Sequence, residues 1–197
     1  MGNRTQVTYP NGAYTTYAYN SRNWVTSVTS KNSSNQVLAS YAYTSYDNVG
    51  NPLHMVEDDG SYTDWGYDNI YRLTSDVKKD SGNSTIYSRT FPQYDSVGNR
   101  LQMIRDGVPT NYTYDQNDNR MLYAGIEGYG YDANGNTTSK TIDVLGTTYY
   151  SYDYENRMTQ VRYPDQSTAD FVYNGDGLRV SKVDLGVERR YLFDGAR

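Results

Sequence analysis

The sequence has no cysteine, which excludes disulfides, cysteine metal sites and thiol nucleophiles. It also has no apolar run close to the roughly 18 residues that a membrane-spanning helix needs, and no signal-peptide pattern opens it. The net charge is −5, and lysine and arginine are scattered without forming a basic stripe. Since phosphate binding needs such a stripe, nucleic acid is not an expected partner.

Tyrosine is the residue that the chain has in abundance. Its aromatic residues comprise 24 Tyr, 3 Phe and 2 Trp, while the hydrophobic content is only 36%. A tyrosine ring can be buried while its hydroxyl reaches water or a polar partner. This bias favours half-buried sheet surfaces over a deep apolar core.

A Tyr-Asp pair recurs along the whole chain at intervals of 17 to 27 residues, which is typical of a repeat architecture. Related pairs are Tyr19-Asn20, Tyr173-Asn174 and Phe193-Asp194. The residues to which we assign a structural role in the repeats are Tyr46, Asp47, Gly50, Tyr67, Asp68, Tyr94, Asp95, Gly98, Asn99, Tyr114, Asp115, Tyr131, Asp132, Gly135, Asn136, Tyr152, Asp153, Asn156, Arg157, Tyr173 and Phe193. We expect one array of about nine repeats over residues 1–197, truncated at both ends.

Each repeat predicts a β-hairpin. Aromatic residues two apart, such as Tyr150 and Tyr152, lie on one face of a strand. The following Asp suits the first position of a type I turn, and a Gly or Asn about three residues later supplies the left-handed conformation that closes the hairpin. No segment shows a helical period beyond one turn. The expected fold is therefore all-β, a curved, spiralling sheet of tandem antiparallel hairpins.

Two turn lengths are expected to alternate. A longer form has Asn or a substitute five residues after Tyr, as in Tyr46/Asn51, and a shorter form reaches its Arg-apolar pair one residue sooner, as at Arg72-Leu73. The copy at Tyr114 breaks this alternation with a long turn. The longer copies are 48, 37 and 42 residues apart, so the effective unit is expected to be a pair of hairpins. The 17-residue interval before Tyr131 predicts that the sheet margin retracts near Gly125.

These motifs resemble RHS/YD repeats, with Tyr94-Asp95-Ser96-Val97-Gly98-Asn99-Arg100-Leu101 as the clearest copy. That family includes bacterial Rhs and polymorphic toxins, cocoon subunits of insecticidal toxin complexes, and teneurins. The resemblance implies a β-ribbon that winds into a shell enclosing or presenting a C-terminal toxin or effector. It also implies a secreted or cell-surface location, in a bacterium in preference to a eukaryote. The Asp pair of the family's self-cleavage site has no counterpart in this sequence, so no catalytic residue is carried over.

The expected role is structural and non-enzymatic, with no cofactor and no metal. His54 is the only histidine, and a half-exposed strand position explains it better than a nucleophilic site. The loops at Asp115 and Asp132 resemble calcium loops, but the twelfth position of each is not Glu, and turn chemistry explains both. Paired-carboxylate hydrolysis is the least favoured alternative, because each Asp already has a turn role.

A cell-surface interaction or carbohydrate-binding module is the main alternative. Pyranose rings stack on exposed aromatic faces, and the candidates are Trp24, Trp65, Tyr149 and Tyr154. Against this, the rings of Tyr67, Tyr114 and Tyr152 are expected to stack across adjacent strands and to stabilise the sheet. Open strand edges would also favour self-association. The expected partners are thus an enclosed polypeptide, a second copy or a glycan.

Overall fold

The computed structural model describes residues 2–193 and divides the chain into two compact units, Met1–Thr110 and Asn111–Arg197. Asp194, the second residue of the pair that begins at Phe193, lies outside the described residues. The predicted all-β fold is confirmed, because all the elements in residues 2–193 are β-strands. None of these residues belongs to a helix that could cross a membrane.

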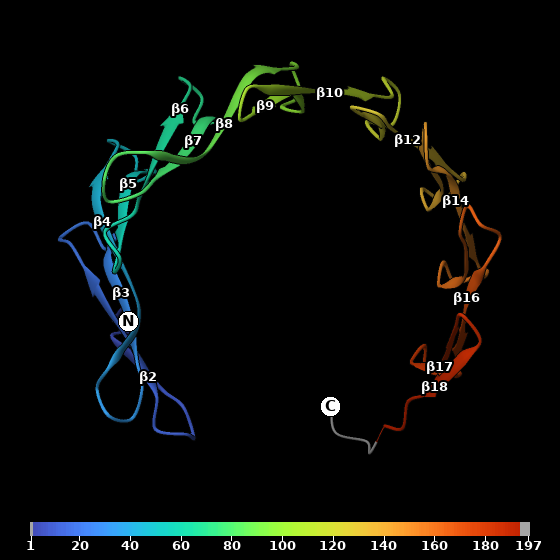
Figure 1. The fold of residues 1–197 in the computed structure, drawn as a ribbon, viewed down its shortest axis with the longest axis horizontal. Coiled ribbons are helices and arrows are strands. Elements are labelled where there is room, and N and C mark those ends of the chain that lie inside the picture. The colour runs from blue at the N-terminus through green and yellow to red at the C-terminus, as the bar shows by residue number, and fades with distance from the viewer. Residues whose placement is uncertain (1, 194–197) are drawn as a thin grey trace. The chain divides into compact units, whose positions relative to one another are not determined.

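The first unit is a sheet in which each strand pairs antiparallel with the next (Figure 1, blue to green). Its strands are β1 (Gln6–Thr8), β2 (Tyr14–Tyr19), β3 (Val25–Lys31), β4 (Val37–Tyr46), β5 (Pro52–Glu57), β6 (Tyr62–Tyr67), β7 (Leu73–Lys79), β8 (Thr85–Tyr94) and β9 (Arg100–Arg105). β10 (Val108–Tyr114) contains the boundary between the units.

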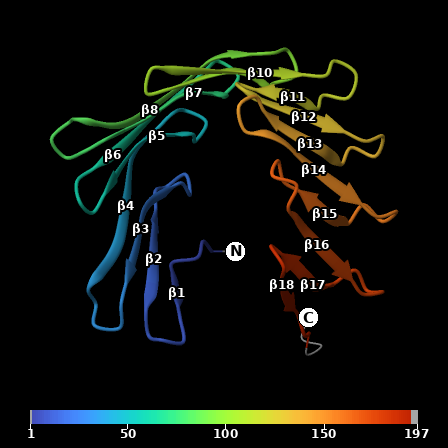
Figure 2. The ribbon, with the colours of Figure 1, turned by 45° about the vertical axis from the view of Figure 1, so that its right-hand side comes forward.

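The second unit repeats this antiparallel order, which Figure 2 shows in yellow to red. Its strands are β11 (Met121–Ala124), β12 (Glu127–Tyr131), β13 (Thr137–Ile142), β14 (Gly146–Tyr152), β15 (Met158–Arg162), β16 (Thr168–Tyr173), β17 (Arg179–Asp184) and β18 (Val187–Arg190). β11 has only 4 residues, whereas β4 and β8 have 10 each. The sheet margin is therefore short at Gly125, as the spacing predicted.

Each sheet is one layer thick. Within residues 2–193 no large side chain is fully buried, and the buried apolar residues are Met55, Phe91, Tyr112, Val161 and Ala169. Most domains pack two layers around a core, but here the strands gain most of their burial from cross-strand neighbours. The tyrosine-rich composition fits such a sheet, because its rings are half-buried.

Antiparallel pairing places the turns alternately at the two margins of each sheet. Every turn that follows a Tyr-Asp or Tyr-Asn pair consequently lies at one margin, which we call the Tyr-Asp margin. It comprises the turns after Tyr19, Tyr46, Tyr67 and Tyr94 in the first unit, and after Tyr114, Tyr131, Tyr152 and Tyr173 in the second. The side chains that link one repeat to the next gather there.

Candidate functional site

The Tyr-Asp turn is held by the carboxylate of its Asp. At Asp153, Oδ1 accepts hydrogen bonds from the backbone N–H groups of Glu155 and Arg157, each at 2.9 Å. Its Oδ2 accepts a third bond from Arg157 Nε at 2.7 Å. Asn156 takes the left-handed conformation with φ 61°. The carboxylate therefore fixes the turn from within, and its two oxygens are both occupied.

A second version of the turn has Asn in place of Arg. Asp132 Oδ1 accepts from the N–H groups of Asn134 at 3.0 Å and Asn136 at 2.9 Å, and Oδ2 accepts from the Asn136 side chain at 2.9 Å. Gly135 supplies the left-handed residue with φ 92°. The turns at Asp47 and Asp95 follow the Asn version, and the turn at Asp68 follows the Arg version.

The prediction that these turns differ in length is wrong. Tyr46 pairs with Pro52 and Tyr67 with Leu73, so both turns advance the chain by six residues. The Arg version looked shorter because Arg72 was matched to Arg100 in the repeat at Tyr94. Arg72 instead binds Asp68 from the position at which Asn99 binds Asp95. The longer turn is the one after Tyr114, which pairs with Met121.

In five of the repeats the tyrosine joins its turn to the preceding turn at the same margin. Its hydroxyl donates to the carbonyl of the first residue in the strand that leaves that earlier turn. Tyr131 reaches Met121 O at 2.7 Å, and Tyr173 reaches Met158 O at 2.9 Å. The same bond joins Tyr46 to Val25, Tyr94 to Leu73 and Tyr152 to Thr137. Each bond joins two strands that are neighbours in the sheet, such as β11 and β12 for Tyr131 or β15 and β16 for Tyr173, at the margin where the two strands belong to different Tyr-Asp turns. The bonds therefore tie neighbouring hairpins together.

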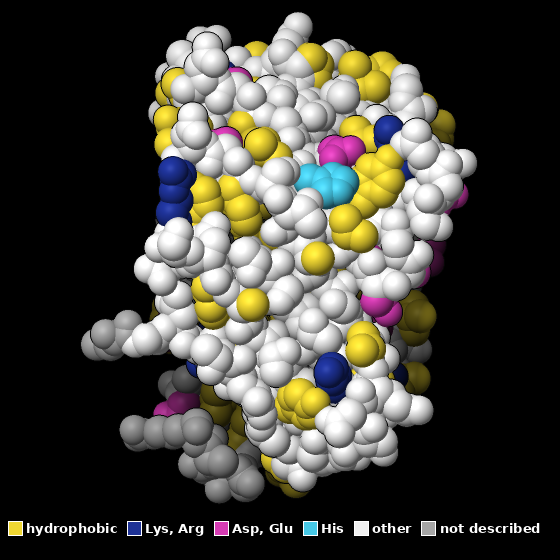
Figure 3. All heavy atoms as spheres, turned by 90° about the vertical axis from the view of Figure 1, so that its left-hand side faces the viewer, with side chains coloured by type: hydrophobic (Ala, Val, Ile, Leu, Met, Phe, Trp, Pro, Cys, Tyr) yellow, Lys and Arg dark blue, Asp and Glu magenta, His cyan; other side chains and the backbone are white. Residues whose placement is uncertain are grey.

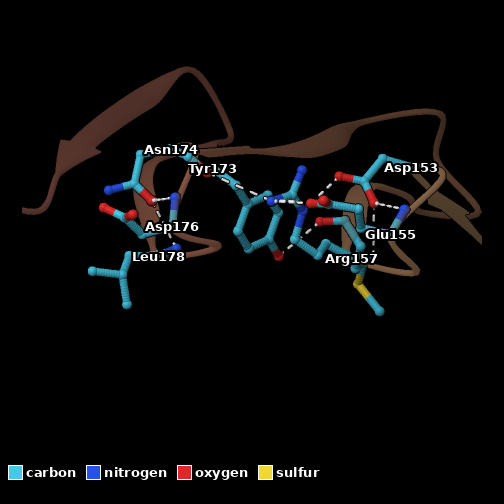
Figure 4. Close-up of polar contacts among 8 residues, drawn as sticks. Asp153, Glu155, Arg157, Tyr173, Asn174, Asp176 and Leu178 are labelled. Carbon is cyan, nitrogen blue, oxygen red and sulfur yellow. Dashed lines mark hydrogen bonds and ion pairs between the residues drawn. The ribbon is translucent and has the colours of Figure 1, made fainter.

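A side chain from the earlier turn completes the joint (Figure 4). The guanidinium of Arg157 lies 5.2 Å from the ring centroid of Tyr173, and its Nη1 lies 3.5 Å from the carbonyl oxygen of Asn174. Such a cation over an aromatic ring is attracted by the ring's electrons. We call this arrangement, a side chain of one turn over the tyrosine of the next, the turn clamp.

Four turn clamps are found within residues 2–193, that of Arg157 included. Arg72 lies over Tyr94 at 4.6 Å, Arg120 over Tyr131 at 5.7 Å, and the indole of Trp24 over Tyr46 at 5.2 Å. Arg72 and Arg120 also donate to the carbonyls of Asp95 and Asp132, at 3.3 and 2.9 Å. These clamps join the turns in pairs, which supports the hypothesis of a two-hairpin unit.

The clamp explains a glycine in the receiving turn. A Cβ on Gly50 would lie 2.9 Å from the Trp24 ring, and one on Gly135 would lie 3.4 Å from Arg120. By contrast, a Cβ on Gly98 would meet nothing within 4 Å. Gly50 is thus required for both its φ of 103° and its close neighbour, whereas Gly98 is required for its φ of 96° alone.

The direct ring stacking expected for Tyr67 and Tyr152 does not occur with any aromatic ring of residues 2–193. At Tyr94, Tyr131 and Tyr173 an arginine takes the place of a second ring, because its planar cation both stacks and donates to carbonyls. The sequence reasoning included Arg157 but missed Arg72, Arg120 and Trp24 as clamp residues. Their shared place just before the outgoing strand was the available signal.

The electrostatics of the turn follow from these bonds. The pKa of Asp132 is held below its ordinary value, chiefly by the hydrogen bond from the Asn136 side chain. Partial desolvation opposes this shift, and hydrogen bonds from backbone N–H groups add to it. The pKa values of Asp47, Asp68, Asp95 and Asp153 are lowered as well. Burial raises the pKa of the Tyr131 hydroxyl, although the positive charge of Arg120 opposes this. The Asp groups are thus held as acceptors and the tyrosine as a donor.

The remaining candidate residues do not gather into one site. Among residues 2–193 there is no group of three His, Asp or Glu side chains that could hold a metal ion. Tyr154 is 89% exposed, and Tyr149 is 45% exposed with Arg162 at 4.6 Å from its ring. His54 is in β5 as a half-exposed residue, but it has a partner that the sequence did not predict, since its Nδ1 lies 2.6 Å from Asp64.

Comparison with known proteins shows what this arrangement is similar to. The RHS Repeat family model matches residues 2–34 and 131–168. No curated protein sequence matches the chain. The fold is similar to part of a Photorhabdus luminescens Tc holotoxin pore, with a TM-score of 0.67 at 19% identity over 91% of this chain and 10% of that chain.

A second similar structure is TcdB2-TccC3 without its hypervariable C-terminal region. Here the TM-score is 0.70 at 16% identity, over 88% of this chain and 11% of that chain. The chain therefore spans about a tenth of the length of the solved structures that it resembles, and at this identity the likeness is one of fold.

Proposed function

We propose that this chain, which matches the RHS Repeat family model over residues 2–34 and 131–168 and shares its fold with parts of two toxin-complex structures, is a structural segment of an RHS/YD-repeat shell that encloses or presents another polypeptide. The observation that carries the proposal is the joint between successive turns. A sheet of one layer lacks a core to stiffen it, and the tyrosine bonds and turn clamps replace that core by tying hairpins to their neighbours.

The proposed role is structural and non-enzymatic. A carboxylate that acts as an acid, base or nucleophile must reach a substrate. In the turns at Asp47, Asp95, Asp132 and Asp153 both carboxylate oxygens accept hydrogen bonds from their own turn. These residues hold the turns of the sheet in place. The enclosed partner is a toxin or effector polypeptide of a secreted or cell-surface bacterial protein.

Limited proteolysis of the parent protein tests enclosure. The parent protein is expressed with the polypeptide encoded downstream of these repeats and is treated with a protease of broad specificity. We expect the downstream polypeptide to be cut much more slowly than the same polypeptide produced alone. Equal cleavage rates would refute enclosure.

A matched pair of variants separates enclosure from general stability. The double variant Arg72→Met and Arg157→Met removes two turn clamps, whereas Arg105→Met and Arg162→Met remove arginines that clamp no Tyr-Asp turn. If the clamps keep the wall closed, the first double variant speeds cleavage of the partner and the second does not. Circular dichroism checks that both retain their β-structure.

A groove in the second unit favours a second candidate function, glycan binding. It has a volume of about 460 Å³, and Gly128 and Gly130 form part of its lining together with Tyr123, Ser139 and Asp143. The ring of Tyr123 lies against Gly128, where a Cβ would be 3.2 Å away, and Tyr123 is 57% exposed. An exposed ring beside hydroxyl and carboxylate groups suits a pyranose.

A glycan array tests this second function. We expect hits that Tyr123→Ala abolishes and that Tyr154→Ala, which changes an exposed ring outside the groove, leaves intact. No hits at high protein concentration would remove the candidate. We also propose self-association through the end strands. Among the described residues, β1 pairs only with β2 and β18 only with β17, so each has one edge open to a strand of another copy.

A further inference from the structure

Three polar residues of the first unit form a row across adjacent strands. Ser45 in β4 pairs with His54 in β5, and His54 pairs with Asp64 in β6. Directly paired residues of an antiparallel sheet point to the same face. The row therefore brings a hydroxyl, an imidazole and a carboxylate side by side, in the order that a serine nucleophile, its base and the orienting acid require.

The second contact of the row is fully formed. His54 Nδ1 lies 2.6 Å from Asp64 Oδ1, and the side chains are 30% and 48% exposed. The His54 ring also lies 5.2 Å from the centroid of Tyr62, which helps to fix its plane. Because a carboxylate only accepts, Nδ1 carries the proton in this bond, and the neutral ring presents Nε2 as an acceptor. Figure 3 shows the histidine, in cyan, open on the surface beside an acidic side chain.

The pairing of Ser45 with His54 follows a β-bulge. Tyr43 pairs with Met55 and Ser45 with His54, so Thr44 has no partner in β5. Bulges redirect side chains and recur beside active sites. Within residues 2–193 the Ser45 hydroxyl makes no hydrogen bond, so a rotation of its side chain toward Nε2 breaks none. Hydrogen bonds at such sites often form only when a substrate is bound.

The next copy of the repeat shows that the fold does not require this row. The positions 48 residues later are Gln93 in β8 and Gln102 in β9, which form the same cross-strand pair beside the same kind of bulge. A serine opposite a histidine is therefore not needed to build the hairpin.

We propose that Ser45 is a reactive serine that is acylated by activated esters, with His54 as its general base and Asp64 as the positioning residue. In the reaction, Ser45 Oγ forms a bond to the acyl carbon, its proton passes to His54 Nε2, and the bond to the leaving alkoxide breaks as that group takes up the proton. The substrate class is an acyl donor. The reactivity of Ser45 is independent of the proposed structural role of the sheet, so either proposal can be refuted while the other stands.

A fluorophosphonate probe tests the proposal on the whole 197-residue chain. The serine oxygen forms a bond to phosphorus, fluoride leaves, and the serine proton passes to His54. Mass spectrometry of digests is expected to place the label on Ser45. Ser45→Ala abolishes labelling, whereas Ser75→Ala, a serine on β7 that pairs with Thr90 and Gly66, does not change it.

Variants of the row separate catalysis from folding. His54→Ala is expected to slow labelling about a hundredfold, within the range that a positioned base contributes, and added imidazole is expected to restore part of the rate. Asp64→Asn slows labelling at least about tenfold while the melting temperature of the folded sheet is retained. Imidazole rescue is a result that a merely structural histidine would not give.

The proposal is overturned if Ser45 is labelled no faster than other serines of the chain. It is also overturned if labelling of Ser45 is unchanged in His54→Ala, or if it is lost there without imidazole rescue while the variant stays folded. His54→Gln, which copies the Gln102 of the following repeat, provides a variant that keeps the fold.

Discussion

The hydrogen bond between a repeat tyrosine and the preceding hairpin can be removed by deleting a single oxygen atom. Tyr131→Phe deletes the hydroxyl that donates to Met121 O at 2.7 Å, and it keeps the ring that Arg120 clamps at 5.7 Å. An intramolecular hydrogen bond of this kind contributes about 1 kcal/mol. We therefore expect Tyr131→Phe to lower the free energy of unfolding by about 1 kcal/mol.

The assay is chemical and thermal unfolding followed by circular dichroism. A loss of about 1 kcal/mol corresponds to a fall of about 2–4 °C in Tm for a chain of this size. Arrays of repeats often unfold in stages, so hydrogen exchange of the β11–β13 amides should locate the weakening. Tyr154→Phe is the control, because Tyr154 is 89% exposed and its hydroxyl has no hydrogen-bond partner among the described residues.

Alkaline pH gives an independent check of the same bond. The pKa of Tyr131 is raised by burial, so the folded state keeps its proton at a pH where the unfolded state has lost it. Its contribution is fully present below the ordinary tyrosine pKa of about 10 and is lost as pH rises through the folded pKa. The difference between wild type and Tyr131→Phe should shrink in that range. A Tyr131→Phe protein as stable as Tyr154→Phe at pH 7 would refute the reasoning.

Three more predictions concern the turns. Gly98→Ala should lower the free energy of unfolding by about 1 kcal/mol, for its left-handed backbone alone. Gly50→Ala should lower it more, because the new Cβ would also lie 2.9 Å from Trp24. Equal urea midpoints for the two variants would contradict this. Arg72→Met should lower Tm more than Arg105→Met, because only Arg72 clamps a Tyr-Asp turn, and differential scanning calorimetry can compare them. Stability should fall in acid, because the pKa of Asp132 is lowered in the folded state. Its contribution to the free energy of unfolding is present above the ordinary Asp pKa and is lost as pH falls through the pKa of the folded state. A urea midpoint unchanged between pH 6 and pH 2 would argue against the turn bonds.

The fold class could be predicted because its signals are local. An Asp that binds the N–H groups two and four residues later, followed by a left-handed residue, uses only five consecutive positions, as at Asp132 and Gly135. Recurrence of that unit with tyrosine before it indicated hairpins and the repeat family. The turn after Tyr67 was misjudged in length because Arg72 stands where other repeats have the Asn that binds the turn carboxylate, and only the side-chain contact with Asp68 reveals this.

The amino-acid sequence by itself thus determined where the chain turns, because a turn depends on the backbone preferences of a few adjacent residues. Only the tertiary structure decided which side chains meet across strands. Arg157 and Tyr173 are joined over one hairpin, and Ser45, His54 and Asp64 are aligned by a bulge at Thr44. Such neighbours depend on strand register, and a shift of one residue turns every side chain of a strand to the opposite face.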